Sequence, residues 1–290
     1  MKKRQLLLII LCLLAVYIIW GSTYIAMFFA IDTIPPLLMC GIRYLIAGIA
    51  LYVFLLLRGQ KNPSRQYWIN SAIVGTFLLV GGTGFVAMAE KWVSSGIAAI
   101  AITTVPLWTC LFSGLFGKWP SKIEWLGLII GFLGIVLLNT HSEFNAKNIG
   151  SLLLIIAPIS WAFGSILAKK IKHAPGLMGT AIQMLSGGVI TSTIGLLFGE
   201  RILAAPSLSS LGALMYLAVF GSLIGFSAYM YLINNVSPAL ATSYAFVNPV
   251  IAVLLGVFIA NESLQTQSLL AMILVISGVV LVIFGERSKY

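Results

Sequence analysis

The sequence predicts an all-α membrane protein of ten transmembrane helices, arranged as two inverted five-helix repeats with both termini in the cytoplasm. Three observations predict it: the composition, the distribution of basic residues and an internal repeat. Hydrophobic residues make up 60% of the chain and charged residues 8%, whereas soluble domains carry about a quarter charged residues. The net charge of +10 forms no basic stripe with interleaved aromatic residues, so nucleic acid is not an expected partner.

Ten apolar stretches are long enough to cross a lipid bilayer. A helix that rises 1.5 Å per residue needs about 20 apolar residues to do so, and charged residues, prolines and asparagines separate the stretches. The first stretch follows a basic start like that of a signal peptide, but it is too long and lacks a clear cleavage site, so we expect it to be retained. The predicted spans are 6–29, 36–57, 68–89, 94–116, 123–140, 150–168, 175–198, 210–233, 239–260 and 267–285.

Basic residues fall almost entirely in alternate loops. Because cytoplasmic loops are enriched in Lys and Arg, the richer side is the cytoplasm, and both termini lie there. One helix more or fewer would destroy this sorting, which supports the number ten. The poorer side holds Lys91, Lys147 and Arg201. The richer side holds Lys2, Lys3, Arg4, Arg58, Lys61, Arg65, Lys118, Lys122, Lys169, Lys170, Lys172, Arg287 and Lys289.

The two halves of the chain resemble each other at an offset of about 140 residues. The matching pairs are IPPLLMCGIRYLIAG (34–48) with HAPGLMGTAIQMLSGG (173–188), and WVSSGIAAIAITTVPLW (92–108) with NVSPALATSYAFVNPVI (235–251). Pro106 aligns with Pro249 in these pairs. Each half holds five helices, an odd number, so the second half is inverted relative to the first. The predicted repeats are residues 1–145 and 146–290.

An inverted repeat indicates transport by alternating access, because each half can adopt the conformation of the other. Such folds hold a substrate near the bilayer midplane, where polar side chains line a cavity. The first span has the polar stretch WGSTY around Ser22, and the sixth has WAFGS around Ser165. A polar group facing lipid would lose its hydration, which favours a cavity for the Trp and Ser positions. For the glycines, close helix packing is the stronger alternative.

Eleven residues are candidates for substrate binding, with aromatic rings for the apolar part and polar groups for hydrogen bonds. Arg43, the one cation well inside a span, is costly in lipid and hence a functional candidate. Its partner is Glu90 or a substrate carboxylate, unless its guanidinium snorkels outward or caps backbone carbonyls. The eleven are Trp20, Ser22, Tyr24, Arg43, Trp108, Trp161, Ser165, Gln183, Tyr229, Tyr244 and Asn248.

Three prolines, a glycine pair and one carboxylate complete the candidate features. Pro106, Pro158 and Pro249 predict helix kinks suited to gating. The Gly127-x-x-x-Gly131 pair predicts a helix contact, either within the chain or across a homodimer. Glu90 is the one near candidate for proton coupling, because the spans contain no carboxylate at mid-depth, and an uncoupled facilitator remains an alternative.

Neither a metal, a cofactor nor an enzyme activity is expected. His141 and His173 fall in loops, and the three cysteines lack Cys-x-x-Cys spacing. The spans contain no constellation of His, Asp, Glu and Cys for acid–base or nucleophilic chemistry.

The order and spacing of four segments resemble EamA-domain members of the drug/metabolite transporter superfamily, and among them the YedA-like branch. The segments are WGSTYIA, IPPLLMCGIRYLIAG, GIAAIAITTVPLWTCLF and FVNPVIAVLLGVFIANESL. The resemblance covers the whole chain and implies an inner-membrane carrier with a cavity lined by helices one to four and six to nine. Family members often carry a Gly-Glu pair after the fourth and ninth spans; here Asn261-Glu262 follows the ninth, and Trp119 stands where the first acid would be.

We therefore expect a secondary transporter of the cytoplasmic membrane that exports a small amphipathic metabolite, such as an amino acid, by rocking of its two halves. The expected partners are this small molecule and the lipid bilayer, with a homodimer left open. A flippase for lipids or their head groups is the alternative, because a cavity that opens sideways between helices would admit lipid.

Overall fold

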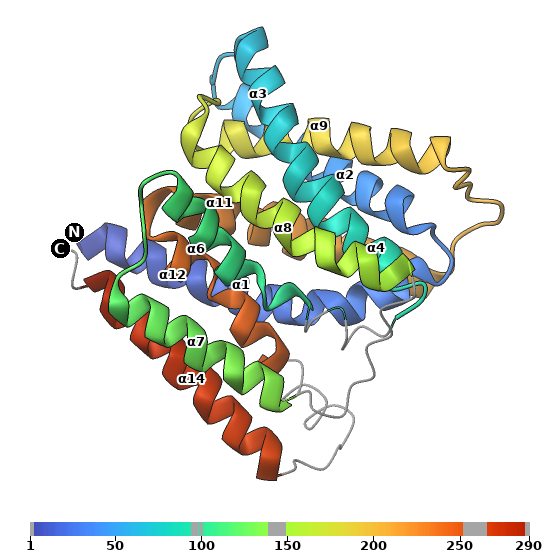
Figure 1. The fold of residues 1–290 in the computed structure, drawn as a ribbon. Coiled ribbons are helices and arrows are strands. Elements are labelled where there is room, and N and C mark those ends of the chain that lie inside the picture. Colours follow the sequence, from blue (N-terminus) through green and yellow to red (C-terminus); the bar gives the residue numbers. More distant parts are fainter. Residues whose placement is uncertain (1–2, 94–97, 99–100, 139–148, 252–265, 288–290) are drawn as a thin grey trace.

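The computed structural model describes residues 3–93, 98, 101–138, 149–251 and 266–287, and all regular structure in them is helical (Figure 1). Parts of three predicted spans lie outside these residues, namely most of 94–100, 139–140 and 252–260. The Asn261-Glu262 pair also lies outside them. The remaining predicted spans can be compared directly with observed helices.

The first half of the chain begins with two long helices that match the first two predicted spans closely. The third span is one continuous helical stretch with a π-helical middle, η1. The helices are α1 (Lys3–Ile31), α2 (Pro36–Leu57), α3 (Arg65–Gly75), η1 (Thr76–Gly84), α4 (Phe85–Ala89), α6 (Val105–Leu115) and α7 (Lys122–Leu138).

The second half repeats this order, including a π-helical middle, η2, in the third stretch. Residues 244–251 are helical and follow a turn at Ser243. The helices are α8 (Ile149–Lys170), α9 (Gly176–Leu197), α10 (Leu208–Tyr216), η2 (Leu217–Phe226), α11 (Ser227–Asn235), α12 (Pro238–Thr242) and α14 (Thr266–Arg287).

Among the residues that the structure describes, six helical stretches are long and apolar enough to cross a membrane, and α6 and residues 269–285 are shorter apolar helices. The six are Lys3–Ile31, Pro36–Leu57, Arg65–Ala89, Ile149–Lys170, Gly176–Leu197 and Leu208–Asn235.

α2 and α9 begin and end alike. Each follows a proline in extended backbone, Pro35 (ψ 140°) and Pro175 (ψ 149°), because the restricted φ of proline suits the residues around a helix start. Each ends before a glycine in the left-handed region, Gly59 (φ 81°) and Gly199 (φ 83°), where a side chain would be strained. The two helices lie side by side (Figure 1).

The helices pair in a regular pattern between the two halves. α1 packs against α10, η2 and α11, while α8 packs against η1 and α4. α6 packs against α12, and α7 packs against α14. The first helix of each half therefore contacts the third stretch of the other, and the second, fourth and fifth helices contact their own counterparts.

α7 and α14 form a pair at one edge of the molecule (Figure 1). A Cβ atom at Gly278 of α14 would lie 2.6 Å from the carbonyl oxygen of Gly127 and 2.5 Å from the amide nitrogen of Gly131. The two backbones thus touch where the glycine pair lies, as small residues allow in membranes. The Gly127-x-x-x-Gly131 contact is therefore made within the chain, and it gives no support to a homodimer.

Substitution of Gly278 by leucine should destabilise the protein by about 1–3 kcal/mol or more, because the neighbouring atoms are backbone and cannot rotate away. The thermal unfolding midpoint of purified protein in nanodiscs measures this loss. Gly212→Leu is the matched control, since a Cβ atom at the helical Gly212 would meet nothing beyond its own helical turn within 4 Å. Equal midpoints for the two variants would contradict the close contact of α7 and α14.

Candidate functional site

A cavity lies among helices of both halves of the chain. The space open to the centre of a water molecule is about 70 Å³, which is room for about five waters, since each occupies roughly 10–15 Å³ on this measure. Without rearrangement such a space holds a ligand of about five non-hydrogen atoms, so a larger metabolite requires the surrounding side chains to move. The lining residues are Trp20, Thr23, Tyr24, Met27, Arg43, Tyr44, Gly82, Thr83, Val86, Ile102, Val105, Trp161, Gly221, Phe226, Tyr244 and Asn248.

Four aromatic side chains pack against one another, and three of them line the cavity. The group, here called the aromatic box, comprises Trp20, Trp161, Tyr244 and, behind the lining, Tyr229. The Trp20 ring lies 4.7 Å from that of Tyr244 and 5.4 Å from that of Trp161, both edge-on. Tyr229 lies 5.3 Å from each tryptophan. Edge-to-face geometry is a favoured arrangement of such rings, so the box is a closely packed apolar surface.

Glycines in the third stretches make room for the two tryptophans. A Cβ atom at Gly82 would lie 2.6 Å from the Trp161 ring, and one at Gly225 would lie 2.5 Å from Nε1 of Trp20. Trp20 Nε1 also donates a hydrogen bond to the carbonyl of Gly221 (3.0 Å). Gly82 lies in η1, and both Gly221 and Gly225 lie in η2. π-helical turns are frequent at functional sites, and here they contain the glycines against which the two tryptophans of the box pack.

Two hydroxyl pairs hold the box in place. Ser165 donates to the carbonyl of Trp161 (2.7 Å) and bonds to the hydroxyl of Tyr229 (2.5 Å). Tyr17 and Ser243 bond through their hydroxyls at 2.7 Å, next to Tyr244. The first pair joins α8 to α11, and the second joins α1 to the turn that precedes residues 244–251.

Arg43 supplies the positive charge of the cavity. Its side chain is 5% exposed, and its guanidinium lies 4.5 Å from the centre of the Tyr44 ring. Nη2 donates to the Tyr44 hydroxyl (2.5 Å), whereas the buried Nε has no hydrogen-bond partner. Among the described residues that line the cavity there is no Asp or Glu, and Nε of the guanidinium remains a free donor.

Glu90 follows α4 directly. Both of its carboxylate oxygens are buried without a hydrogen-bond partner, so no hydrogen-bonded ion pair joins it to Arg43. Glu90 lies one helical turn after Val86, which lines the cavity, whereas Glu90 itself is not among the lining residues.

Six of the eleven predicted substrate-binding residues line the cavity: Trp20, Tyr24, Arg43, Trp161, Tyr244 and Asn248. With its amide oriented to satisfy its neighbours, Asn248 donates to the carbonyls of Tyr17 (3.3 Å) and Tyr244 (3.0 Å).

The other five lie elsewhere. Tyr229 and Ser165 belong to the box and its support. Ser22 bonds to the Tyr216 hydroxyl (2.6 Å) and to the carbonyl of Ile19, which ties α1 to α10. Trp108 is half-buried and outside the lining, and Gln183 is fully buried with neither end of its amide hydrogen-bonded.

The predicted kink prolines occupy three different settings. Pro158 lies inside α8. Pro106 lies in the first turn of α6, directly after a turn at residues 103–104. Pro249 lies in the helical residues 244–251, after the turn at Ser243. The fourth and ninth stretches are thus both interrupted, and each has a residue lining the cavity near the break, Val105 and Tyr244.

Ten lining residues were not predicted from the sequence. Tyr44 is the most important of these, because its hydroxyl accepts a hydrogen bond from the guanidinium of Arg43. Its position next to Arg43 in the sequence is the feature from which it could have been predicted. Thr83 stands alone among glycines in VGGTGF, which marks it as a polar group in an apolar stretch. The ten are Thr23, Met27, Tyr44, Gly82, Thr83, Val86, Ile102, Val105, Gly221 and Phe226.

Comparison with known proteins identifies the family. The model of the EamA-like transporter family matches residues 7–140 and again residues 148–284. The inner membrane transporter YedA of Escherichia coli (strain K12) is 48% identical over 287 residues, which cover 99% of this chain and 94% of the relative. A transporter of Synechocystis sp. is 27% identical and covers 96% of this chain and 91% of its own.

A solved crystal structure shares the fold. It superposes with a TM-score of 0.80 at 20% sequence identity, and the match covers 99% of this chain and all of the other. The resemblance inferred from the sequence is confirmed. The chain belongs to the EamA-like transporter family and is a multi-pass transporter of the cell membrane rather than an enzyme.

Proposed function

We propose that the chain exports a small amphipathic metabolite, such as an amino acid with an apolar side chain, by alternating access. One observation carries the proposal: a small cavity combines a wall of packed aromatic rings with an arginine whose Nε has no hydrogen-bond partner. Guanidinium groups bind carboxylates through paired hydrogen bonds, and aromatic rings bury apolar groups. The two sets of groups match the two ends of such a substrate.

The proposed architecture is ten transmembrane helices in two inverted repeats, residues 1–145 and 146–290. Four features support it. The family model matches twice along the chain, η1 and η2 begin about 140 residues apart, α2 and α9 share their boundary residues, and the helices pair across the halves as a two-fold axis requires.

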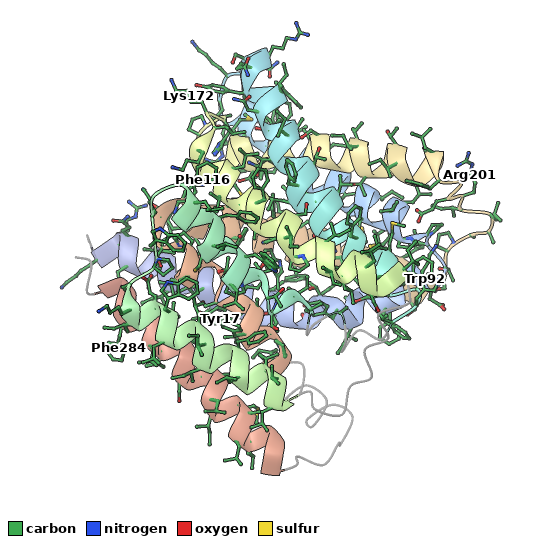
Figure 2. The ribbon with its side chains drawn as sticks, viewed as in Figure 1. Tyr17, Trp92, Phe116, Lys172, Arg201 and Phe284 are labelled. Atoms are coloured by element: carbon green, nitrogen blue, oxygen red, sulfur yellow. The ribbon has the colours of Figure 1, made fainter. Side chains whose placement is uncertain are left out.

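The proposed orientation has both termini in the cytoplasm. The start of α1 and the end of α14 lie at one end of the molecule (Figure 1). Phe116 and Lys172 lie towards the same end, whereas Trp92 and Arg201 lie at the other (Figure 2). The end that carries Lys172 is the one rich in basic residues, which supports its placement on the cytoplasmic side.

Alternating access has a physical route in this arrangement. The aromatic box takes Trp20 from the first half and its other three rings from the second. A rotation between the halves therefore opens or closes the box. The interrupted fourth and ninth stretches can absorb such a change, because broken helices at the centre of transporters line cavities and tolerate backbone rearrangement.

Counterflow of radiolabelled amino acids in proteoliposomes tests the function. Trp20→Ala should lower exchange about tenfold or more, because a buried aromatic side chain contributes about 1.5–3 kcal/mol. Arg43→Ala should lower it about tenfold to a hundredfold, because hydrogen bonds to a charged group contribute about 1.5–3 kcal/mol. The exposed Trp92 and Arg58 supply the matched controls Trp92→Ala and Arg58→Ala, which should keep wild-type exchange.

Two results would contradict the proposal. If the cavity variants and the controls lost exchange to the same extent, the cavity would not be the site of transport. If no solute exchanges under any gradient while a fluorescent lipid crosses the bilayer, a lipid flippase replaces the metabolite carrier.

The orientation is tested by labelling single cysteines in intact cells with a membrane-impermeant maleimide. In a background with the three native cysteines replaced by serine, Asp32→Cys and Arg201→Cys should react from outside. Arg58→Cys and Lys172→Cys should react only after the membrane is permeabilised. All four positions lie in connections between the long helices. The opposite pattern would invert the topology, and a mixed pattern would change the number of spans.

A further inference from the structure

We propose that Arg43 and Glu90 bind the two charges of a zwitterionic substrate, and that a proton replaces the substrate's ammonium group on Glu90 when the site is empty. The inference rests on the proposed function, because it assigns the charge type of the substrate and the coupling ion of the same cavity. It is carried by a buried guanidinium whose Nε has no hydrogen-bond partner and by a carboxylate whose two buried oxygens have none either.

The guanidinium of Arg43 is positioned for a carboxylate. A guanidinium has five N–H donors, and the one hydrogen bond observed here goes to the Tyr44 hydroxyl. The ring and hydroxyl of Tyr44 hold the group in one orientation while Nε stays without a partner. Because a buried donor without a partner is costly, a ligand that accepts from these nitrogens is stabilised.

The carboxylate of Glu90 is positioned for a cation. Its two oxygens are buried and accept no hydrogen bond, and Val86, one helical turn earlier on α4, lines the cavity. A carboxylate taken out of water without a partner is unstable. It is satisfied either by protonation or by an ammonium group that enters from the cavity.

Within the described parts of the chain, no cation forms a hydrogen bond with the carboxylate of Glu90, and the neighbouring Lys91 side chain is exposed. Its charge acts on Tyr24 of α1 and on Cys40 and Arg43 of α2. Glu200, which also acts on Cys40, is committed to the start of α2, where it accepts from the amides of Leu37 (3.2 Å) and Leu38 (2.9 Å). Arg43 is therefore the single cation near Glu90 among these groups.

A zwitterion satisfies both charges, whereas a simple anion or cation leaves one of them without a partner. With its carboxylate on Arg43 and its ammonium towards Glu90, an amino acid places its apolar side chain against the aromatic box. A carboxylic acid without an ammonium group accepts hydrogen bonds from Arg43 but leaves the Glu90 carboxylate without a cation. The arrangement thus selects against both singly charged analogues.

Competition at Glu90 couples transport to protons. The ammonium group binds the ionised carboxylate, so binding releases the proton from Glu90 into the water of the cavity. After the substrate leaves on the far side, a proton returns to Glu90 from that side. One substrate moves out for each proton that moves in, and an inward proton gradient drives export.

Calorimetry on protein in nanodiscs tests this with three ligands that share one apolar group: leucine, 4-methylpentanoate and 3-methylbutylamine. Wild type should bind leucine about tenfold to a hundredfold more tightly than either analogue. Titration in two buffers of different ionisation enthalpy should show proton release with leucine. Glu90→Gln should bind leucine and 4-methylpentanoate about equally and release no proton. Arg43→Gln should bind leucine and 3-methylbutylamine about equally.

Asp32→Asn is the control, because it removes an exposed acid from the loop after α1, and it should keep the wild-type preference and proton release. If Arg43→Gln does not fold, Glu90→Gln alone decides. The inference is overturned if wild type binds leucine and 4-methylpentanoate equally, or if Glu90→Gln releases as many protons as wild type. In either case, leucine counterflow by wild type would still support the proposed transport function. If wild type neither binds nor exchanges any amino acid, the proposed function falls as well.

Discussion

Placing a guanidinium inside an apolar bundle is the constraint on which the rest of this structure depends. A cation in the hydrocarbon region is stable only if protein or trapped water replaces its hydration. Around Arg43 that replacement is partial, because the Tyr44 hydroxyl accepts a hydrogen bond from one nitrogen and the Tyr44 ring contacts one face of the guanidinium. The surrounding helices must therefore leave space, and the cavity is the consequence of a charge that its neighbours do not fully satisfy.

That space is made by backbone as much as by side chains. η1 and η2 widen the third stretch of each half, and their glycines lie against the two tryptophans of the aromatic box. A larger residue at Gly82 or Gly225 would occupy the position of an indole ring. The packing of the box therefore depends on the glycines of the π-helical turns.

The helix boundaries follow from the sequence because the thickness of the bilayer and the prolines and glycines at its surfaces determine them; the second predicted span, 36–57, coincides with α2. The rotation of each helix does not follow in this way. The polar group of Ser22, next to Trp20 in the sequence pattern, predicts a place at the cavity, yet its hydroxyl bonds to that of Tyr216. Tyr44 and Thr83 line the cavity, although the sequence pattern does not predict it. In a helix that is apolar all round, hydrophobic periodicity does not mark an inner face, and the π-helical turns shift the faces further.

The first half of the molecule carries Arg43 where the second carries the neutral Gln183, and this difference has an electrical consequence. In an exact inverted repeat the two orientations of the carrier would be equivalent. Any rotation that displaces Arg43 along the bilayer normal does work against the membrane potential, up to about 2.3 kcal/mol for a full charge crossing 100 mV. If the two halves rock as proposed, the resting voltage of the cell biases which side the empty carrier faces.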